Sequence, residues 1–256
     1  MIQQGPGRGF EIRAVLFDLD DTLYDRTVAN RRRAEWFAQT FVCAGDERQR
    51  REAVDLIVSL DALGYGSKDA LLQQLRDLYP CLRRHTASFK DTFDRQLLQY
   101  LSLDPETTRL LSTLRAAQVP CGIVTNGSPF QLQKIKRLGL DEHALCILVS
   151  DLFGCKKPEE RIFRAAAAEI GVPLEQTLFV GDHPYNDIWG AHRVGMKTAW
   201  LQRYQPWPRD LSDLVPDLIL RHVAELARVW DDTMASRSSP LQLPDPETRP
   251  SSSDRG

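Results

Sequence analysis

Five short apolar runs, each followed by polar residues, constrain the fold of this chain more than any other feature. They comprise residues 14–17, 121–124, 146–149, 177–180 and 198–201. Short apolar runs of this kind are typical of strands that are buried on both faces. Helical patterns lie between the later runs, at residues 129–138, 158–170 and 187–194, and each is followed by a glycine, a common helix terminator. Strands that alternate with helices predict an α/β fold with a Rossmann-like, three-layer parallel sheet core.

The long stretch between the first and second runs contains no convincing strand. Its amphipathic patterns predict helices at residues 30–41, 48–60, 68–78 and 88–100. We therefore expect residues 25–103 to form an inserted helical cap between two parts of one core, residues 11–24 and 104–230. Within the second part, we expect residues 217–220 to form a sixth strand at the sheet edge, followed by a last helix through Trp230.

The two ends of the chain differ in composition from the predicted core. Residues 1–10 are rich in Gly and Gln, and we expect a flexible N-terminus. Ser, Pro and charged residues dominate residues 231–256, which carry too little apolar surface to offset the entropy lost on ordering. We therefore expect this tail to be disordered.

Composition narrows the classes of protein to which the chain can belong. The formal net charge is −2, which is unlike the basic surface of a nucleic-acid binder. No run approaches the roughly 20 apolar residues of a membrane helix, and the first residues lack the apolar segment of a secretory signal. The five cysteines form no C-x-x-C motif and suit a reducing compartment. We expect a cytoplasmic protein without nucleic-acid or membrane partners, either a monomer or a homodimer.

Polar side chains that can carry chemistry stand where four of the predicted strands end. They are Asp18, Asp20, Asp21 and Thr22 after the first run, Thr125, Asn126 and Gly127 after the second, Lys156 and Lys157 after the third, and Asp182, Asn186 and Asp187 after the fourth. Because ligands bind beyond the carboxyl ends of parallel strands, we expect these residues to meet at one edge of the sheet. Gathered carboxylates repel one another unless a hard cation sits among them, and Mg²⁺ prefers such oxygen ligands. The sequence therefore predicts a magnesium site.

These residue types suit phosphoryl transfer. Asp18, directly at a strand end, is placed to attack phosphorus and form an aspartyl-phosphate. Asp20, two residues further on, would be held mostly protonated, would protonate the leaving oxygen and would then deprotonate water. Thr125 and the backbone amides of Asn126 and Gly127 are predicted to bind the phosphoryl oxygens, because a glycine permits close approach of the backbone.

Three further residues complete the predicted site. Lys157 would supply a fixed positive charge against the phosphoryl oxygens and Asp18. Asp182 is expected to bind the metal directly, and Asp187 to act on it only indirectly, by supporting a ligand or through water. Lys156 is the immediate neighbour of Lys157, so spacing alone leaves open which of the two lysines reaches the site.

The strand-end residues resemble the four motifs of the haloacid dehalogenase-like (HAD) superfamily. The matching elements, in chain order, are Asp18-x-Asp20-x-Thr22, Thr125-Asn126-Gly127, Lys157-Pro158 and Gly181-Asp182-x-x-x-Asn186-Asp187. The resemblance covers about residues 12–230, and the helical insert resembles the C1 cap of that superfamily. It implies the roles given above and Mg²⁺ as the cofactor, with Asp20 contributing its backbone carbonyl. The residues implied around the metal are Asp18, Asp20, Asp182 and Asp187. Lys157, which directly precedes the proline, fits the motif better than Lys156.

The second aspartate of the first motif separates branches of the superfamily. The resemblance implies the phosphatase branch, because the metal-independent dehalogenases lack an equivalent of Asp20. We expect a magnesium-dependent phosphomonoester hydrolase that acts on a small phosphometabolite, a sugar phosphate or a nucleoside monophosphate, through an aspartyl-phosphate. Two alternatives stay open, a phosphomutase with the same nucleophile and a non-catalytic binding protein with the HAD fold.

The helical insert is expected to close over the site and to select the leaving group. Tyr24 and Asp25 stand where the chain enters the insert. A contact with substrate and a contact within a hinge are equally compatible with their position.

Overall fold

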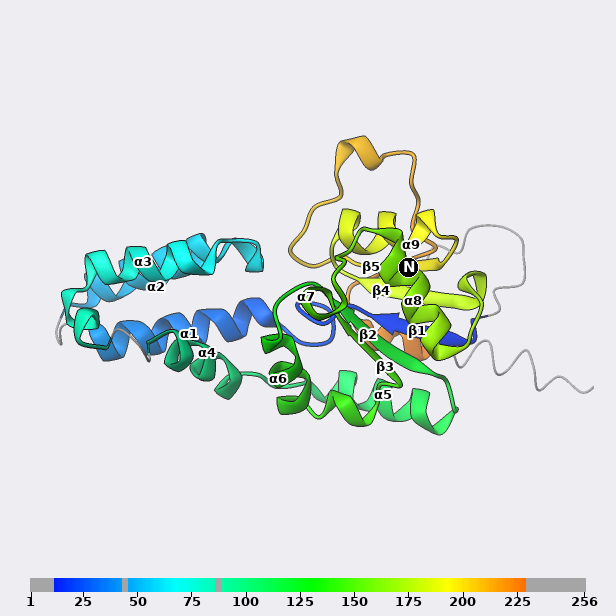
Figure 1. Ribbon diagram of the computed structural model, residues 1–256, viewed down its shortest axis with the longest axis horizontal. Coiled ribbons are helices and arrows are strands. Elements are labelled where there is room, and N and C mark those ends of the chain that lie inside the picture. The colour runs from blue at the N-terminus through cyan, green and yellow to red at the C-terminus, as the bar shows by residue number, and fades with distance from the viewer. Residues whose placement is uncertain (1–11, 43–45, 86–88, 229–256) are drawn as a thin grey trace, which may run out of the picture.

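The computed structural model describes residues 12–42, 46–85 and 89–228. The flexible N-terminus and the disordered tail predicted from the sequence, residues 1–10 and 231–256, lie outside these ranges. Figure 1 shows two lobes, a sheet flanked by helices and, beside it, a group of helices without a strand.

The core of the first lobe is a parallel sheet. Its strands are β1 (Ala14–Phe17), β2 (Cys121–Thr125), β3 (Cys146–Val149), β4 (Thr177–Gly181), β5 (Lys197–Leu201) and β6 (Leu218–Leu220). Their order across the sheet is β3-β2-β1-β4-β5-β6, so β1 lies between β2 and β4. Phe17 pairs with Ile123 on one side and Val180 on the other, which brings the loops after these three strands together. The predicted fold class is confirmed, and the sixth strand lies at the sheet edge as expected.

Helices cover both faces of this sheet and complete three layers. One face carries α5 (Pro105–Ala116), α6 (Phe130–Arg137) and the turn η7 (Val223–Glu225). The other carries α8 (Glu160–Ile170) and α9 (Gly190–Arg193). The remaining short elements of this lobe are α7 (Ser150–Phe153), η3 (Leu140–Glu142), η4 (Leu174–Gln176), the π-helix η5 (Pro184–Trp189) and η6 (Arg209–Leu211).

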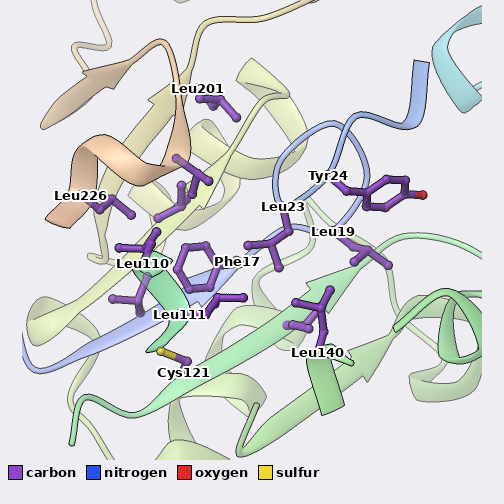
Figure 2. Close-up of a cluster of buried hydrophobic side chains, with 14 of the residues drawn as sticks. Phe17, Leu19, Leu23, Tyr24, Leu110, Leu111, Cys121, Leu140, Leu201 and Leu226 are labelled. Carbon is purple, nitrogen blue, oxygen red and sulfur yellow. The ribbon is translucent and has the colours of Figure 1, made fainter. Parts of the chain in front are cut away.

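The side chains of the central strand β1 point alternately to the two faces of the sheet, and this alternation decides which layer of helices each of them packs against. Phe17 belongs to the cluster under α5, with Leu110 and Leu111, as Figure 2 shows. Leu16 belongs to the opposite cluster, with Phe163 of α8. Successive side chains of a strand point to opposite faces, so an entirely apolar strand is buried only when both faces are covered. The burial of every residue of β1 follows from this arrangement.

The second lobe, called the cap below, comprises residues 26–99. Its elements are α1 (Arg26–Phe41), α2 (Glu47–Asp61), η1 (Ala62–Gly64), α3 (Lys68–Leu78), η2 (Pro80–His85) and α4 (Phe89–Gln99). It has a hydrophobic cluster of its own, which includes Phe37, Ile57, Leu75 and Phe93. Its first helix begins where the Asp25 carboxylate accepts a hydrogen bond of 2.8 Å from the backbone N–H of Val28, a typical N-cap.

The sequence-based prediction of the core helices was incomplete. The prediction missed α5, although Asp104 caps it and Pro105 occupies its first turn, a combination typical of helix starts. The last helix was expected to reach residue 230, which lies outside the described residues. In the described part of the chain it consists of η7 and three helical residues, 226–228. None of the described helices is long and apolar enough to cross a membrane.

The helix predicted at residues 187–194 begins earlier than expected. It starts at Pro184 as a π-helix and continues into α9. The ring nitrogen Nδ1 of His183 accepts hydrogen bonds from the backbone N–H groups of Tyr185 and Asn186, at 3.2 and 3.1 Å. A ring acceptor caps the first turn here, which a search for Ser, Thr, Asp or Asn caps does not detect.

We expect Phe163→Ala to lower the free energy of unfolding by about 3–5 kcal/mol, because it leaves a cavity in the layer under α8. Phe163 is fully buried and meets the ring of Phe179 edge-on, with the centroids 5.0 Å apart. Leu152→Ala is the control, since Leu152 is 57% exposed and its loss should cost less than about 0.5 kcal/mol. Urea unfolding followed by circular dichroism measures both values, and equal losses would contradict this description of the core.

Candidate active site

The strand-end residues line a cavity between the core and the cap. Its volume is about 220 Å³, and the loop between α2 and α3 forms part of its wall. The lining residues that the sequence predicted are Asp18, Asp20, Asp21, Thr125, Asn126, Gly127, Lys157, Asp182, Asn186 and Asp187. A larger open hollow of about 700 Å³ between α5 and η7 shares none of these residues. The cavity at the cap is therefore the candidate active site.

Lys157 lies between two carboxylates at the centre of this site. Its Nζ is 2.7 Å from Asp18 Oδ1 and 2.7 Å from Asp187 Oδ1, and only 1% of its side chain is exposed. Burial alone would lower the pKa of the ammonium, but the two carboxylates outweigh burial and hold that pKa above its usual value. Lys156 is exposed to solvent, so the structure brings Lys157 and not its neighbour to Asp18.

Asp18 is buried directly beyond the end of β1. Its backbone N–H donates to the carbonyl oxygen of Val180, at 2.9 Å, which continues the ladder between β1 and β4. Its Oδ2 accepts a hydrogen bond of 3.1 Å from the hydroxyl of Thr22. Burial raises the pKa of the Asp18 carboxyl to about 7, with Lys157 opposing the shift and Asp187 adding to it. Both of its oxygens are therefore held in defined directions.

Asp18, Asp182 and Asp187 form a buried carboxylate cluster. One oxygen from each lies within 4.8 Å of the others. Burial raises the pKa of Asp182 to about 9, and repulsion from the other two carboxylates adds to the shift. One ammonium, that of Lys157, does not balance three carboxylates. The residues present fit a hard divalent cation such as Mg²⁺, which takes carboxylate oxygens as ligands.

Asp187 joins this cluster because the loop after β4 folds back on itself. Its Oδ2 accepts a hydrogen bond of 2.9 Å from the backbone N–H of His183. A Cβ atom at Gly181 would overlap the Asp187 carboxyl group, so the last residue of β4 has to be a glycine for this packing. The glycine at position 181 and the hydrogen bond from His183 thus place the carboxylate of Asp187 in the cluster that also contains Asp182.

The carboxylate of Asp20 lies outside the cluster of three. It accepts hydrogen bonds from Lys134 Nζ, at 2.8 and 3.0 Å, from Gln131 Nε2, at 2.7 Å, and from the hydroxyl of Tyr24. Burial would raise the pKa of this carboxyl, but the charges of Lys134 and Arg26 outweigh burial and hold the pKa well below its usual range. The expectation that Asp20 is mostly protonated is therefore wrong for this structure, because the sequence did not reveal these donors.

The loop after β2 differs from the expected phosphate cradle in one respect. Thr125 is buried at the site, and its hydroxyl oxygen accepts a hydrogen bond of 2.7 Å from Gln131 Nε2. The backbone N–H of Gly127, expected to face a phosphoryl oxygen, donates instead to the hydroxyl of Ser150, at 2.9 Å. Ser150 is the first residue of the helix α7, which follows β3. The partner of the Gly127 amide thus comes from a distant segment that the sequence around Gly127 did not reveal.

Asn126 fixes the loop that carries Lys157. Its Oδ1 accepts from the backbone N–H of Lys157, at 2.8 Å, and its Nδ2 donates to the backbone carbonyl oxygen of the same residue, at 2.9 Å. Sequence reasoning missed this positioning contact. It also missed several residues of the site, namely Arg26, Asp61, Gln131, Lys134 and Ser150.

Arg26 connects the cap to the site. Its terminal guanidinium nitrogens lie 2.6 and 2.7 Å from the two carboxylate oxygens of Asp61, at the end of α2. Asp61 also accepts a hydrogen bond of 3.0 Å from the backbone N–H of Gly64 and so fixes the loop before α3. From this loop, the ring of Tyr65 meets the ring of His183 edge-on, with centroids 5.1 Å apart. The cap therefore touches the loop that carries the carboxylate cluster.

The two residues at the entrance to the cap both have internal partners. Tyr24 is buried and donates to Asp20, and Asp25 caps α1 and accepts a hydrogen bond of 2.8 Å from the hydroxyl of Tyr204. Neither residue lines the cavity between cap and core. Their contacts thus favour the interpretation as a hinge over direct contact with substrate.

Comparisons with known proteins agree with this fold. The model of the haloacid dehalogenase-like hydrolase family matches residues 12–195. The chain therefore belongs to this family, and the predicted recognition and enzyme class are confirmed. A glyceraldehyde 3-phosphate phosphatase of Pyrococcus abyssi is 34% identical over 201 residues, which are 75% of this chain and 82% of the relative.

Two further matches extend the likeness over more of the chain. A glyceraldehyde 3-phosphate phosphatase of Methanopyrus kandleri is 32% identical over 234 residues, 85% of this chain and 97% of the relative. The crystal structure of a HAD phosphatase from Thermococcus onnurineus superposes with a TM-score of 0.63 at 21% identity, over 86% of this chain and 98% of its own. At that identity, the superposition supports the fold alone.

In protein stripped of divalent cations, we expect the free energy of unfolding to fall as the pH rises from about 4 to about 9. The pKa values of Asp18 and Asp182 in the folded protein, about 7 and about 9, exceed the ordinary value of 3.8. Between these limits the folded chain binds more protons than the unfolded chain, so stability is lost as the pH increases. Urea unfolding in EDTA across this range measures the slope. The amide in Asp182→Asn does not titrate, so this substitution should flatten the dependence of the unfolding free energy on pH above neutral pH. An unchanged dependence would refute the raised pKa of Asp182.

Proposed function

We propose that this hydrolase is a magnesium-dependent phosphatase that transfers the phosphoryl group of a short-chain sugar phosphate to Asp18 and then to water. The observation that carries the proposal is the buried Asp18 at the end of β1, with Lys157 at 2.7 Å and two further carboxylates within 4.8 Å. A nucleophilic carboxylate, a fixed cation and a set of metal ligands are the parts that such a transfer needs.

In the first half of the reaction, the Asp18 carboxylate attacks phosphorus and the bond from phosphorus to the leaving oxygen breaks. The hydroxyl of Thr125 and the ammonium of Lys157, which line the same cavity, bind the phosphoryl oxygens. Asp20 gives a proton to the leaving oxygen. Magnesium held by the carboxylate cluster and the backbone carbonyl of Asp20 would neutralise phosphoryl charge, which lets an anionic carboxylate approach phosphorus.

In the second half, a water molecule attacks the aspartyl-phosphate. Asp20 accepts the proton of that water, the new bond from oxygen to phosphorus forms, and the bond from phosphorus to Asp18 breaks. Asp18 leaves as a carboxylate and inorganic phosphate is released. The proton that Asp20 has gained is the one that it gives to the leaving oxygen of the next substrate, so one carboxyl group serves both halves.

The size of the cavity supports a short substrate. Its volume of about 220 Å³ lies below the range of roughly 300–1,000 Å³ that is typical of sites for drug-sized ligands. The cap wall is mixed, with leucines such as Leu60 and Leu71 beside polar side chains. The polar ones include Arg26, Ser67 and Lys68, which suit the hydroxyl and carbonyl groups of a sugar phosphate. The two relatives named above are glyceraldehyde 3-phosphate phosphatases, and we infer a substrate of that class for this chain.

We further propose that the reaction takes place in the cytoplasm. Among the described residues, Cys81, Cys121, Cys146 and Cys155 are free thiols. Unpaired cysteines are typical of proteins kept in a reducing compartment, where small phosphorylated metabolites are also found.

Asp18→Asn should abolish phosphate release, by at least about 10³-fold, because an amide cannot replace the nucleophile. Asp141→Asn changes an exposed carboxylate in the turn η3 and serves as the control. Phosphate release from a panel of phosphometabolites, with and without Mg²⁺, measures the effect. Turnover by the Asp18→Asn protein, or turnover that persists after removal of the metal, would overturn the mechanism.

We expect kcat/KM for triose phosphates to exceed that for nucleoside monophosphates by at least about tenfold, since the larger leaving group does not fit a cavity of about 220 Å³ without opening of the cap. Glycerol 3-phosphate and glyceraldehyde 3-phosphate should rank together at the top of the panel. Equal efficiency on adenosine monophosphate would show that the cavity volume does not govern selection.

A further inference from the structure

Two buried polar side chains of α6, Gln131 and Lys134, are not part of any motif that the sequence singled out. They lie three residues apart on one face of the helix, with 4% and 5% of their surface exposed. A buried lysine is costly unless its charge is paired, so its presence at this position requires a partner. Both side chains line the cavity between cap and core.

The shared partner is the carboxylate of Asp20. Lys134 Nζ lies 2.8 Å from Oδ1 and 3.0 Å from Oδ2, and Gln131 Nε2 lies 2.7 Å from Oδ2. Both donors come from the core and not from the cap, so they stay beside Asp20 when the cap moves. The other cation near this carboxylate, Arg26, belongs to the cap and is further away, at 3.9 Å.

Gln131 also contacts the residue proposed to bind phosphate. Its Nε2 donates to Thr125 Oγ1 at 2.7 Å. The hydroxyl keeps its single proton for donation, and in the structure it donates to the backbone carbonyl oxygen of Asn126 at 3.5 Å. A hydrogen bond of this length is weak and can be exchanged for one to a phosphoryl oxygen. One side-chain amide therefore joins the acid/base carboxylate to the hydroxyl that would bind phosphate.

The loop after β2 is built around this amide. Gly127 has a φ of +143°, a region that favours glycine. A Cβ atom at this position would lie 3.0 Å from Gln131 Cγ and 3.2 Å from its Cδ. The absence of a side chain at Gly127 thus leaves the room in which Gln131 reaches both partners.

We propose that Gln131 and Lys134 are positioning residues for the hydrolysis, Lys134 acting through Asp20 alone and Gln131 through both Asp20 and Thr125. The inference rests on the proposed function, because it assigns a task to groups that the proposed mechanism uses. Gln131 and Lys134 differ in that only Gln131 contacts Thr125, so their substitutions should have different effects.

The first test is a double-mutant cycle between Lys134 and Asp20. Lys134→Met should lower kcat for glyceraldehyde 3-phosphate by at least about tenfold, within the 10²–10⁴-fold that general acid–base catalysis contributes. In an Asp20→Asn background, the same substitution should change kcat by no more than about twofold, since its target is already absent. Lys134→Arg keeps the charge and should recover most of the activity.

Matched controls separate positioning from general damage to the helix. Lys136→Met changes an exposed lysine of the same helix and should leave kcat unchanged. Each variant is compared with wild type by urea unfolding, and if Lys134→Met does not fold, Lys134→Gln replaces it in the cycle. Independent losses of kcat from Lys134 and Asp20 substitutions, in folded proteins, would overturn the role of Lys134.

The second test uses inorganic phosphate, the product, as a probe of Thr125. In titration calorimetry with Mg²⁺ present, Gln131→Leu should weaken phosphate binding by about three- to tenfold, the effect of losing one hydrogen bond. Lys134→Met should leave that affinity within about twofold of wild type, because Lys134 does not touch Thr125. Equal weakening by both substitutions, or none by Gln131→Leu, would refute the division of roles.

Different results would overturn the proposed function and the positioning roles of Gln131 and Lys134. A wild-type protein that releases no phosphate from any substrate would overturn the proposed function and, with it, the positioning roles. A wild-type phosphatase in which the effects of Lys134 and Asp20 substitutions add independently would keep the proposed function and overturn only the inference drawn from α6.

Discussion

The ammonium of Lys157, buried between the carboxylates of Asp18 and Asp187, is the interaction on which the architecture of the site depends. Three carboxylates within 4.8 Å of one another would repel strongly in a medium of low dielectric constant. Lys157 offsets part of that repulsion and orients Asp18 at 2.7 Å. Removing one member of such a group leaves an uncompensated buried charge, which is why the loops after β1, β3 and β4 depend on one another. The central position of β1 in the sheet brings these loops close enough for the contact.

The site has two sets of charges with different tasks. Around Asp18 the three carboxylates outnumber the one cation, Lys157, which suits the binding of a divalent metal ion. Around Asp20 the cations Lys134 and Arg26 prevail and hold the pKa of its carboxyl below the usual range. The two sets lie within one cavity because Asp18 and Asp20 are two residues apart in the chain. An acid/base carboxylate held in this way has to be protonated before it can act as an acid, and the proton taken from water in the second half of the proposed reaction supplies that state.

The cap has a hydrophobic cluster of its own, but its residues Ala29 and Leu97 belong to the core cluster under α5. The two lobes therefore meet through apolar as well as polar contacts. Arg26 and Asp61 fix the loop that presents Tyr65 to His183, and Lys68 lies 5.3 Å from the ring centroid of Phe130 in the core. Relative movement of two lobes is the usual expectation unless the interface between them is large and hydrophobic. Opening of the cap would therefore admit a ligand without unfolding either lobe, and in the proposed mechanism closure would exclude water during the first transfer.

Much of the fold could be predicted from the sequence, because short apolar runs bounded by polar loops are a strong indication of a parallel sheet. The helix α5 was missed, although Asp104 and Pro105 marked its start. The π-helix at Pro184 was missed for a different reason, since its cap is the ring of His183 and lies outside the usual set of capping side chains. The motif residues were predicted because each stands at a strand end, where position along the chain determines position in space.

The sequence alone predicted that Asp18, Thr125, Lys157 and Asp182 lie at one edge of the sheet, because each follows a predicted strand. The hydrogen-bond and ion-pair partners of these groups could be identified only from the folded structure, because the partners come from segments that are far apart in the chain. Lys134 lies 114 residues from Asp20, and Ser150 lies 23 residues from Gly127. Hydrogen bonds and charges act over a few ångströms of space irrespective of separation along the chain. For this reason the protonation state of Asp20 and the engagement of the Gly127 amide followed from packing, whereas the identity of the site followed from the sequence.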